Sequence, residues 1–285
     1  MPTAPSDDLA AWIGRRETVE DRVDPRRVAD LAATLDRPAP PPGAPLPPAW
    51  HWILFNRFVP AGEVGADGHP RRGGFLPPVP LPRRMWAGGR LRFHDALPVG
   101  AAARRESEIV KVEPKRGRSG ELVFVLVRHR IFADDRLAIT EEHDIVYREA
   151  PAPGTKGPAS EPAPARGAWR DTVRPDPVLL FRYSALTLNG HRIHYDQPYV
   201  TAVEGYPGLV VHGPLIATLL LDLALRAAPG RWIDSFSFRA LSTLFVDSPF
   251  TVNGQPDGGG ARLWAANEAG ALAMQATIEF SAHPI

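Results

Sequence analysis

The chain has 285 residues, of which 44% are hydrophobic, so it is long enough for one large domain or for two of ordinary size. Its 33 basic residues nearly balance its 32 acidic residues, which gives no reason to expect nucleic acid or an anionic membrane as a partner. There is no cysteine, and this excludes disulfides, zinc–thiolate sites and cysteine nucleophiles.

No segment has the features of a targeting or membrane-spanning sequence. Asp7 and Asp8 precede any apolar run, unlike the start of a signal peptide. The longest apolar stretch, residues 208–225, is interrupted by His212 and Asp222, whereas a membrane-spanning helix needs about 20 predominantly apolar residues. We therefore expect a cytoplasmic protein, and the lack of cysteine fits a reducing compartment.

In the first half of the chain, helical segments precede a run of strands. Residues 24–35 have apolar side chains at helical spacing, with Asp24 as N-cap and a proline at the first helical position. Residues 37–48 and 69–82 predict loops rich in proline or glycine, while the apolar segment 49–59 fits a second buried helix or a strand. Runs rich in valine, isoleucine and phenylalanine then predict antiparallel strands at residues 89–94, 103–112, 122–132 and 137–148.

A segment of proline, glycine and alanine divides the chain. Residues 151–168 contain almost no large apolar side chain, so we predict a linker there between two domains at 1–150 and 169–285. In the second half, residues 179–188 are expected to begin as a strand and become a short helix, before a long apolar helix at 213–228. The order of helix and then strands thus occurs twice and indicates an internal duplication, with the later strands at 232–244, 249–253, 262–266 and 271–280.

The segment from Tyr183 to Asp196 holds the most informative polar residues of the chain. It places Asn189, His191 and His194 within six positions, and a glycine turn soon afterwards begins the apolar helix. An imidazole can act as acid or base near neutral pH, and an amide can hold a water molecule. Backbone N–H groups at a helix N-terminus can stabilise a developing oxyanion.

This segment resembles the hydratase signature of the MaoC-like, (R)-specific enoyl-CoA hydratases. Two positions depart from that signature: Asn189 stands where the family has its catalytic aspartate, and His191-Arg192 replaces an Asn-Pro pair. The variant is similar to a branch with an N-terminal dehydratase-like half, which includes mesaconyl-CoA hydratases and mitochondrial 3-hydroxyacyl-thioester dehydratases. The residues that match the signature are Tyr183, Ala185, Leu186, Thr187, His194 and Asp196.

The resemblance implies an α+β double hot-dog fold, in which two antiparallel sheets each wrap a long central helix. Residues 1–150 would then form a degenerate hot-dog domain, and residues 169–285 the catalytic one. The implied activity is that of a hydro-lyase, which reversibly adds water to an α,β-unsaturated acyl-CoA such as mesaconyl-CoA or another short, branched or dicarboxylic acyl-CoA. This reaction requires no metal and no cofactor, because the CoA thioester is itself the substrate.

Three residues are expected to carry this reaction. His194 falls on the family's catalytic histidine and would exchange the proton, Asn189 would orient the water, and the Gly213 N–H would stabilise the thioester enolate. Each residue also has a purely structural explanation. These are a buried histidine bonded to its neighbours, an asparagine favoured in the turn before Gly190, and a Gly-Pro helix start.

Other residues are candidates for contact with the substrate. His191 and Arg192 could bind a distal carboxylate or a CoA phosphate, and the alternative is an exposed loop pair. Tyr183 and Arg239 are further candidates for substrate binding. Arginines of the first half could also reach the phosphates of CoA, namely Arg83, Arg84 and Arg90.

Two residues are expected to support the site without taking part in the chemistry. Asp196 precedes Gln-Pro and is expected to cap a short helix, and His212 is expected to pack at the turn before the apolar helix. Zinc is not expected, because no nearby carboxylate triad accompanies His191 and His194.

Two other functions remain open at this stage. Hot-dog proteins also hydrolyse acyl-CoA, although the hydratase-type motif argues against a thioesterase. The replacement of aspartate by Asn189 leaves room for a non-catalytic protein that binds acyl thioesters. The acyl carrier is either CoA or acyl carrier protein, and we expect a monomeric pseudo-dimer or a homodimer.

Overall fold

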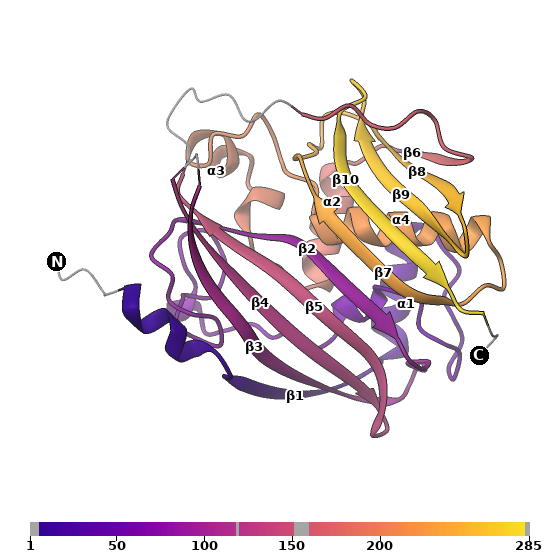
Figure 1. Cartoon of the computed structure of the whole chain (residues 1–285), viewed down its shortest axis with the longest axis horizontal. Coiled ribbons are helices and arrows are strands. Elements are labelled where there is room, and N and C mark those ends of the chain that lie inside the picture. Colours follow the sequence, from indigo (N-terminus) through magenta and orange to yellow (C-terminus); the bar gives the residue numbers. More distant parts are fainter. Residues whose placement is uncertain (1–5, 118–119, 151–159, 283–285) are drawn as a thin grey trace.

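The computed structural model describes residues 6–117, 120–150 and 160–282, and its central feature is one continuous antiparallel sheet of ten strands (Figure 1). The strand order is β1-β3-β4-β5-β2-β7-β10-β9-β8-β6, so the first five strands of the chain occupy one side of the sheet and the last five the other. The two sides join edge to edge where β2 pairs with β7, from Gly88 opposite Arg239 to Arg92 opposite Ser235.

The first half of the sheet is built from long strands with one buried face. In β4, alternate residues from Val123 to Ile131 are buried, as period-two alternation predicts for a sheet that covers a core on one side. The bounds of the strands are β1 Arg16–Arg22, β2 Arg83–Phe93, β3 Ala102–Gly117, β4 Gly120–Ala133 and β5 Arg136–Arg148. In the second half they are β6 Trp169–Val173, β7 Ile233–Ala240, β8 Phe250–Asp257, β9 Gly260–Asn267 and β10 Leu272–Phe280.

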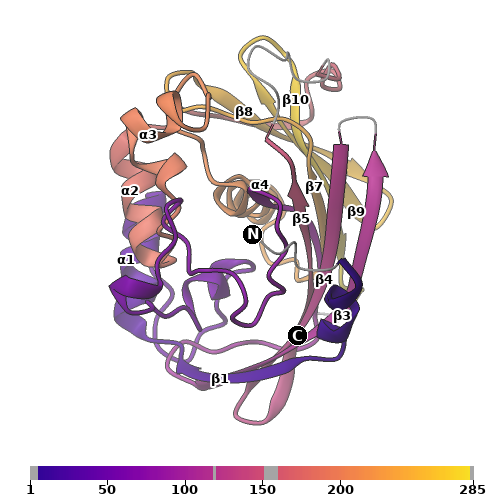
Figure 2. The ribbon, with the colours of Figure 1, turned by 90° about the vertical axis from the view of Figure 1, so that its left-hand side faces the viewer.

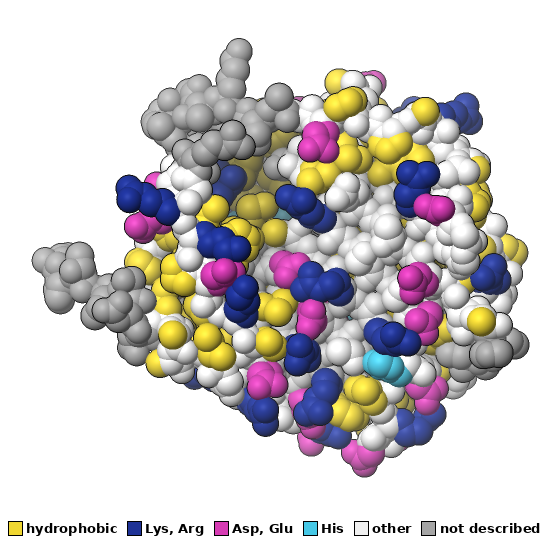
Figure 3. Space-filling view, viewed as in Figure 1, with side chains coloured by type: hydrophobic (Ala, Val, Ile, Leu, Met, Phe, Trp, Pro, Cys, Tyr) yellow, Lys and Arg dark blue, Asp and Glu magenta, His cyan; other side chains and the backbone are white. Residues whose placement is uncertain are grey.

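The opposite face of the sheet carries charged side chains of both signs (Figure 3). Arg90 on β2 contacts Glu142 at 2.9 Å and Asp144 at 2.7 Å on β5, and Arg128 on β4 contacts Glu142 at 3.0 Å. Such exposed ladders contribute little to stability, but they fix which face of the sheet meets solvent.

The helices lie on the buried face of the sheet (Figure 2). Helix α4, Gly213–Ala227, is buried along most of its length and packs against β6, β8, β9 and β10. Helices α1, Pro25–Leu35, α2, Pro177–Leu186, and α3, Gln197–Ala202, form an outer layer on the far side of α4. Arg37, directly after α1, forms a two-point ion pair with Asp222 of α4 at 2.8 and 2.9 Å, which ties the two halves together.

The structure differs from the predicted pair of sheets in two details. The two half-sheets are continuous through β2 and β7, and among the described residues a long central helix is found only in the second half. In the first half, α1 packs against α2, and the connection between α1 and β2 fills the space beside β3 to β5 (Figure 2). Proline and glycine are so frequent in this connection that it cannot form a long helix, and its only helical turns are the short segments Trp50–Ile53 and Ala61–Glu63.

Several local predictions are confirmed and one is wrong. Asp24 caps α1 by accepting a hydrogen bond from the Arg26 N–H at 2.9 Å, as its sequence predicts. Residues 179–188 do not begin as a strand, because Asp176 already caps α2 by accepting from the Leu179 N–H at 2.7 Å. The strands β1 and β6 are absent from the prediction, since both are short edge strands rich in charged residues.

The predicted linker lies partly outside the described residues, at 151–159. Its remainder runs along the second half, where the Ala163 N–H donates to Gly270 O at 2.8 Å. The division into domains at 1–150 and 169–285 stays a prediction, although each of these segments supplies five neighbouring strands. Within the described part of the chain, no helix has the length and apolar character needed to cross a membrane.

Candidate active site

The end of α2 places Asn189 at the wall of a cavity. The Thr187 hydroxyl donates to Tyr183 O at 2.7 Å, Leu188 turns into the left-handed region with φ 49°, and the Asn189 N–H donates to Ser184 O at 2.8 Å. The Asn189 Oδ1 then accepts from the His191 N–H at 3.0 Å, which is the asparagine turn that its sequence context predicts. Its amide NH2 group has no partner among the described residues and is free to hold a water or a substrate oxygen.

A loop from the first half of the chain holds the segment that follows Asn189. Gly68 and Gly190 pack backbone against backbone, so closely that a Cβ on Gly190 would lie 2.5 Å from Gly68 O. Asp67 O accepts from the Arg192 N–H at 2.9 Å, and Ala66 O accepts from the Arg192 guanidinium at 3.0 Å. Both glycines are needed for this close approach, through which the first half positions residues of the second.

His194 is buried and its tautomer is fixed. Its Nδ1 lies 2.7 Å from Val210 O, and because a carbonyl can only accept, Nδ1 must carry the hydrogen. Its ring stacks on His212 with centroids 3.6 Å apart and an angle of 17°. Burial lowers the pKa of His194 to about 3, so the ring is neutral at neutral pH. Nε2 then has a free lone pair, with no hydrogen-bond partner among the described residues, and can act as a base.

The start of α4 presents free backbone donors beside this imidazole pair. His212 is the N-cap residue but makes no side-chain capping bond, because its Nε2 pairs with the Ser184 hydroxyl at 2.8 Å. The Gly213 N–H has no partner among the described residues, and Pro214 has no N–H at all. This helix end therefore offers the Gly213 N–H and a favourable dipole to an oxyanion.

A second imidazole pair lies next to the first. The rings of His69 and His191 have centroids 4.3 Å apart, and His191 lies 5.6 Å from His194. Burial lowers the pKa of His191 to about 4 and that of His69 well below its usual range, and the charge of Arg84 lowers both further. Tertiary folding also brings Asp67 to this pair, with the ligand atoms of Asp67, His69 and His191 all within 4.8 Å of one another. The sequence argument that His191 lacks a nearby carboxylate therefore did not foresee Asp67.

We expect the buried imidazoles to make the protein sensitive to acid. The pKa of His191 is about 4 and that of His194 about 3 in the folded chain, against about 6.5 when unfolded. Between these values the unfolded chain binds more protons, so the free energy of unfolding falls as the pH decreases below 6.5. These two residues alone should remove about 4 kcal/mol between about pH 7.5 and about pH 5. Urea unfolding at both pH values measures the loss, and equal stability at the two would contradict these pKa shifts.

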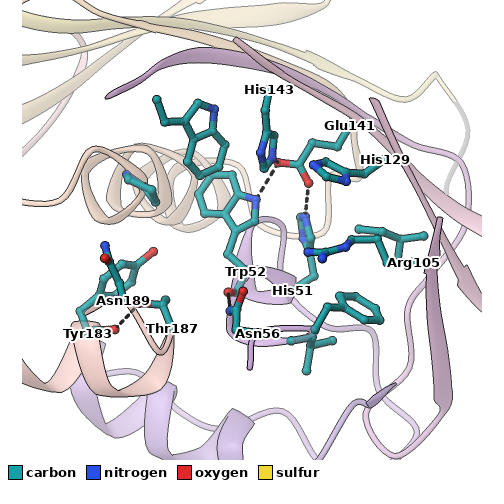
Figure 4. Close-up of a pocket in the computed structure, with 15 residues that line it drawn as sticks. His51, Trp52, Asn56, Arg105, His129, Glu141, His143, Tyr183, Thr187 and Asn189 are labelled. Atoms are coloured by element: carbon teal, nitrogen blue, oxygen red, sulfur yellow. Dashed lines mark hydrogen bonds and ion pairs between the residues drawn. The ribbon is translucent and has the colours of Figure 1, made fainter. Parts of the chain in front are cut away.

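A cavity of about 250 Å³ extends from this segment into the first half of the chain (Figure 4). Its wall on the side of the second half consists of Tyr183, Thr187, Asn189 and Pro214. Two of the predicted site residues, Asn189 and Tyr183, thus line the cavity, while His194 and Gly213 are not among its lining residues. The opposite wall is supplied by the first half: His51, Trp52, Leu54, Phe55, Asn56, Trp86, Arg105, His129, Ile131, Glu141 and His143.

A buried polar network on this opposite wall is absent from the sequence predictions. The Glu141 carboxylate accepts from Trp52 Nε1 at 2.7 Å, His51 Nε2 at 2.9 Å and His143 Nε2 at 2.5 Å. Burial alone would raise the pKa of Glu141, but the neighbouring His143 and His51 together hold it well below its usual range. A signal was present, because Glu141 and His129 fall on the faces of predicted strands that are otherwise apolar.

The arginines predicted to bind substrate mostly have partners within the protein. The Arg192 guanidinium pairs with Asp196 at 2.8 Å and stacks 4.0 Å above the ring of Tyr199. Asp196 is also the N-cap of α3. Arg239 is exposed on β7, and its guanidinium makes no hydrogen bond or ion pair with the described residues. Arg83 contacts the Glu204 carboxylate at 3.4 Å. Arg83 therefore has an anionic partner, whereas the guanidinium of Arg239 has none among the described residues.

Comparison with known proteins links this geometry to a family. The pattern of the family "Hydroxyacyl-thioester dehydratase type 2" matches residues 49–246. The chain is 51% identical over 279 residues to a mesaconyl-C(4)-CoA hydratase of Chloroflexus aurantiacus, covering 96% of this chain and 98% of that one. It is 31% identical over 235 residues to the mitochondrial hydroxyacyl-thioester dehydratase type 2 of Schizosaccharomyces pombe, covering 73% of this chain and 77% of that one.

The fold is also found in a solved structure. A conserved protein of Mycobacterium tuberculosis with a double hot-dog fold superposes with a TM-score of 0.61 at 17% identity, and the match covers 96% of this chain and 97% of that one. The predicted double hot-dog fold is thereby confirmed, with the two half-sheets fused into one in this chain.

Proposed function

This chain belongs to the hydroxyacyl-thioester dehydratase type 2 family, and from that premise we propose that its substrate is mesaconyl-C4-CoA or another short dicarboxylic enoyl-CoA. The chain is a hydro-lyase, which interconverts an enoyl thioester and a 3-hydroxyacyl thioester by adding or removing water. The choice of acyl group is supported by the 51% identity to a mesaconyl-C(4)-CoA hydratase along nearly the whole chain.

In the proposed mechanism, His194 Nε2 takes a proton from water while the water oxygen bonds to Cβ of the enoyl group. The electrons of the double bond move onto the thioester oxygen, and the Gly213 N–H stabilises the resulting enolate. His194 then returns the proton to Cα, and the thioester bond stays intact throughout. The Asn189 amide orients the water, since an amide cannot itself exchange the proton. Dehydration uses the same groups in reverse.

The observation that carries this proposal is the fixed tautomer of His194. Its Nδ1–H is held by Val210 O, and burial keeps the ring neutral, so a lone pair at Nε2 is available at neutral pH. The free Gly213 N–H begins the helix directly after His212, on which His194 stacks. A base and an oxyanion donor therefore come from adjacent segments, as acid–base catalysis next to a thioester requires.

The remaining features of the proposed enzyme follow from this chemistry. Acid–base catalysis with backbone stabilisation requires no cofactor besides the CoA or acyl-carrier thioester. We place the enzyme in the cytoplasm, as a single chain with two fused hot-dog halves or as a homodimer of such chains. Neither nucleic acid nor a membrane is needed as a partner.

A panel of enoyl-CoAs tests the proposed function. The purified protein is incubated with crotonyl-CoA and mesaconyl-C4-CoA, and the absorbance of the conjugated thioester is followed together with release of free CoA. We expect the absorbance to fall without release of CoA. Stoichiometric CoA release would instead identify a thioesterase. Unchanged absorbance with all substrates, from folded protein, would contradict the proposal and favour a protein that only binds thioesters.

Asn189→Ala should lower kcat/KM by about 100-fold, because the variant loses the amide that orients the attacking water. Asn189→Asp should keep more activity than Asn189→Ala, since a carboxylate can also accept from the His191 N–H and hold a water. Steady-state hydration of mesaconyl-C4-CoA measures both effects.

Asn267→Ala is the matched control for this prediction. Asn267 also accepts a backbone N–H through Oδ1, from Ala271 at 2.8 Å, but it is the last residue of β9, next to the turn that leads to β10. If Asn189→Ala and Asn267→Ala had the same kinetics, Asn189 would only stabilise its turn and would not orient the attacking water.

A further inference from the structure

The end of the cavity formed by the first half has buried side-chain nitrogens that lack hydrogen-bond partners among the described residues. We call this region the polar end of the cavity and define it by His51, Arg105, Glu141 and His143 (Figure 4). Arg105 Nε and His51 Nδ1 are both buried and have no hydrogen-bond partner among the described residues. Buried polar atoms are nearly always paired, so two unpaired atoms in one cavity wall point to a polar ligand.

Arg105 is a cation without a close acceptor. It lies on the inner face of β3, and its side chain is only 20% exposed. Burial lowers the pKa of Arg105, which shows how poorly its charge is solvated, although a guanidinium stays charged at neutral pH. The Glu17 carboxylate is its nearest anionic partner, at 3.4 Å, a distance longer than a usual charged hydrogen bond. Figure 4 shows the guanidinium pointing towards His51 and the cavity.

The neighbouring Glu141 does not supply the missing acceptor, because it accepts from Trp52, His51 and His143 and makes no hydrogen bond or ion pair with Arg105. Its effect is to fix the orientation of His51. With Nε2 of His51 donating to Glu141, Nδ1 is left as the ring nitrogen without a partner among the described residues. A carboxylate of a ligand would give Arg105 the close anionic partner that Glu17, at 3.4 Å, does not provide.

We propose that the polar end of the cavity binds the free carboxylate of a dicarboxylic acyl thioester, with Arg105 as the residue that determines this specificity. The inference rests on the proposed function, since it names the feature of the substrate that the enzyme recognises. The mesaconyl group carries such a carboxylate, because only one of its two carboxyl groups forms the thioester. An acyl group with a methyl in that position leaves Arg105 unpaired and binds more weakly.

Equilibrium binding of two saturated thioesters tests this proposal without turnover. Succinyl-CoA has a free carboxylate, and butyryl-CoA has a methyl group in the same position. Calorimetric titration of the full chain should show that succinyl-CoA binds at least about 10-fold more tightly than butyryl-CoA. Arg105→Gln should abolish that preference. Arg105→Lys should retain part of it, because lysine keeps the charge but not the planar fork.

Arg104→Gln is the matched control. Arg104 is the neighbouring residue on the opposite face of β3, where it pairs with Glu106 and Asp135. This variant should keep the preference for succinyl-CoA. Equal affinity of the unsubstituted protein for both thioesters, or a preference that survives in Arg105→Gln and Arg105→Lys, would overturn the proposal.

The result of this binding test can be distinguished from the result of the hydration test of the proposed function. Hydration of crotonyl-CoA without preference for succinyl-CoA would leave the hydratase proposal intact and remove this one. Preference for succinyl-CoA in a protein that hydrates no enoyl-CoA would support the carboxylate site and contradict the hydratase proposal.

Discussion

His194→Ala should reduce the hydration rate of mesaconyl-C4-CoA by about 1000-fold, because the variant loses the group that exchanges the proton. The reduction should appear in kcat, since the variant loses the proton exchange but keeps the residues that line the cavity. Loss of the buried ring also leaves Val210 O without its 2.7 Å partner, so thermal unfolding must confirm that the variant is folded under the assay conditions.

His94→Ala is the control for this result. His94 is an exposed histidine whose ring bonds to the Thr140 hydroxyl at 2.9 Å, and its replacement should leave the hydration rate unchanged. A folded His194→Ala variant with more than about a tenth of the normal kcat would exclude His194 as the acid and base.

Gly213→Ala should lower the activity of the protein without lowering its stability. Nothing lies within 4 Å of a Cβ added to Gly213, and alanine is a better helix former than glycine, so the variant should unfold at the same or a higher temperature. Its kcat/KM should nevertheless fall by about 100-fold, because the new methyl group occupies the space through which the thioester oxygen approaches the Gly213 N–H. Differential scanning calorimetry and steady-state kinetics on one preparation measure both quantities.

Gly62→Ala is matched to this variant, since a Cβ on Gly62 also has nothing within 4 Å and Gly62 lies in the short helical turn Ala61–Glu63, outside the cavity lining. It should change neither activity nor stability appreciably. If Gly213→Ala were as active as Gly62→Ala, the Gly213 N–H would have no role as an oxyanion donor.

Local signals in the sequence were sufficient to predict most of the elements. Asp24 with the following proline determines the start of α1, and the apolar run after Pro214 determines α4. Alternation in β4 reveals a buried face because each second residue meets the core. The start of α2 was missed because Asp176 and Pro177 were not recognised as a cap and first turn, although they have the same pattern as Asp24 and Pro25.

Features that depend on contacts between distant segments could not be predicted in this way. The fusion of the half-sheets depends on β2 pairing with β7, two strands separated by about half of the chain. The residues of the site could likewise be predicted only in part. His194 and Asn189 lie in one recognisable segment, whereas Asp67, His51 and Arg105 reach the site only through tertiary folding. Nothing in their immediate neighbours along the chain marks them as part of one cavity.

Mass spectrometry of the product formed from mesaconyl-C4-CoA tests the central claim most directly. The account predicts an intact CoA thioester heavier than the substrate by one water molecule, formed by the unsubstituted protein and not by His194→Ala. Unchanged substrate, or free CoA together with the dicarboxylic acid, would contradict it.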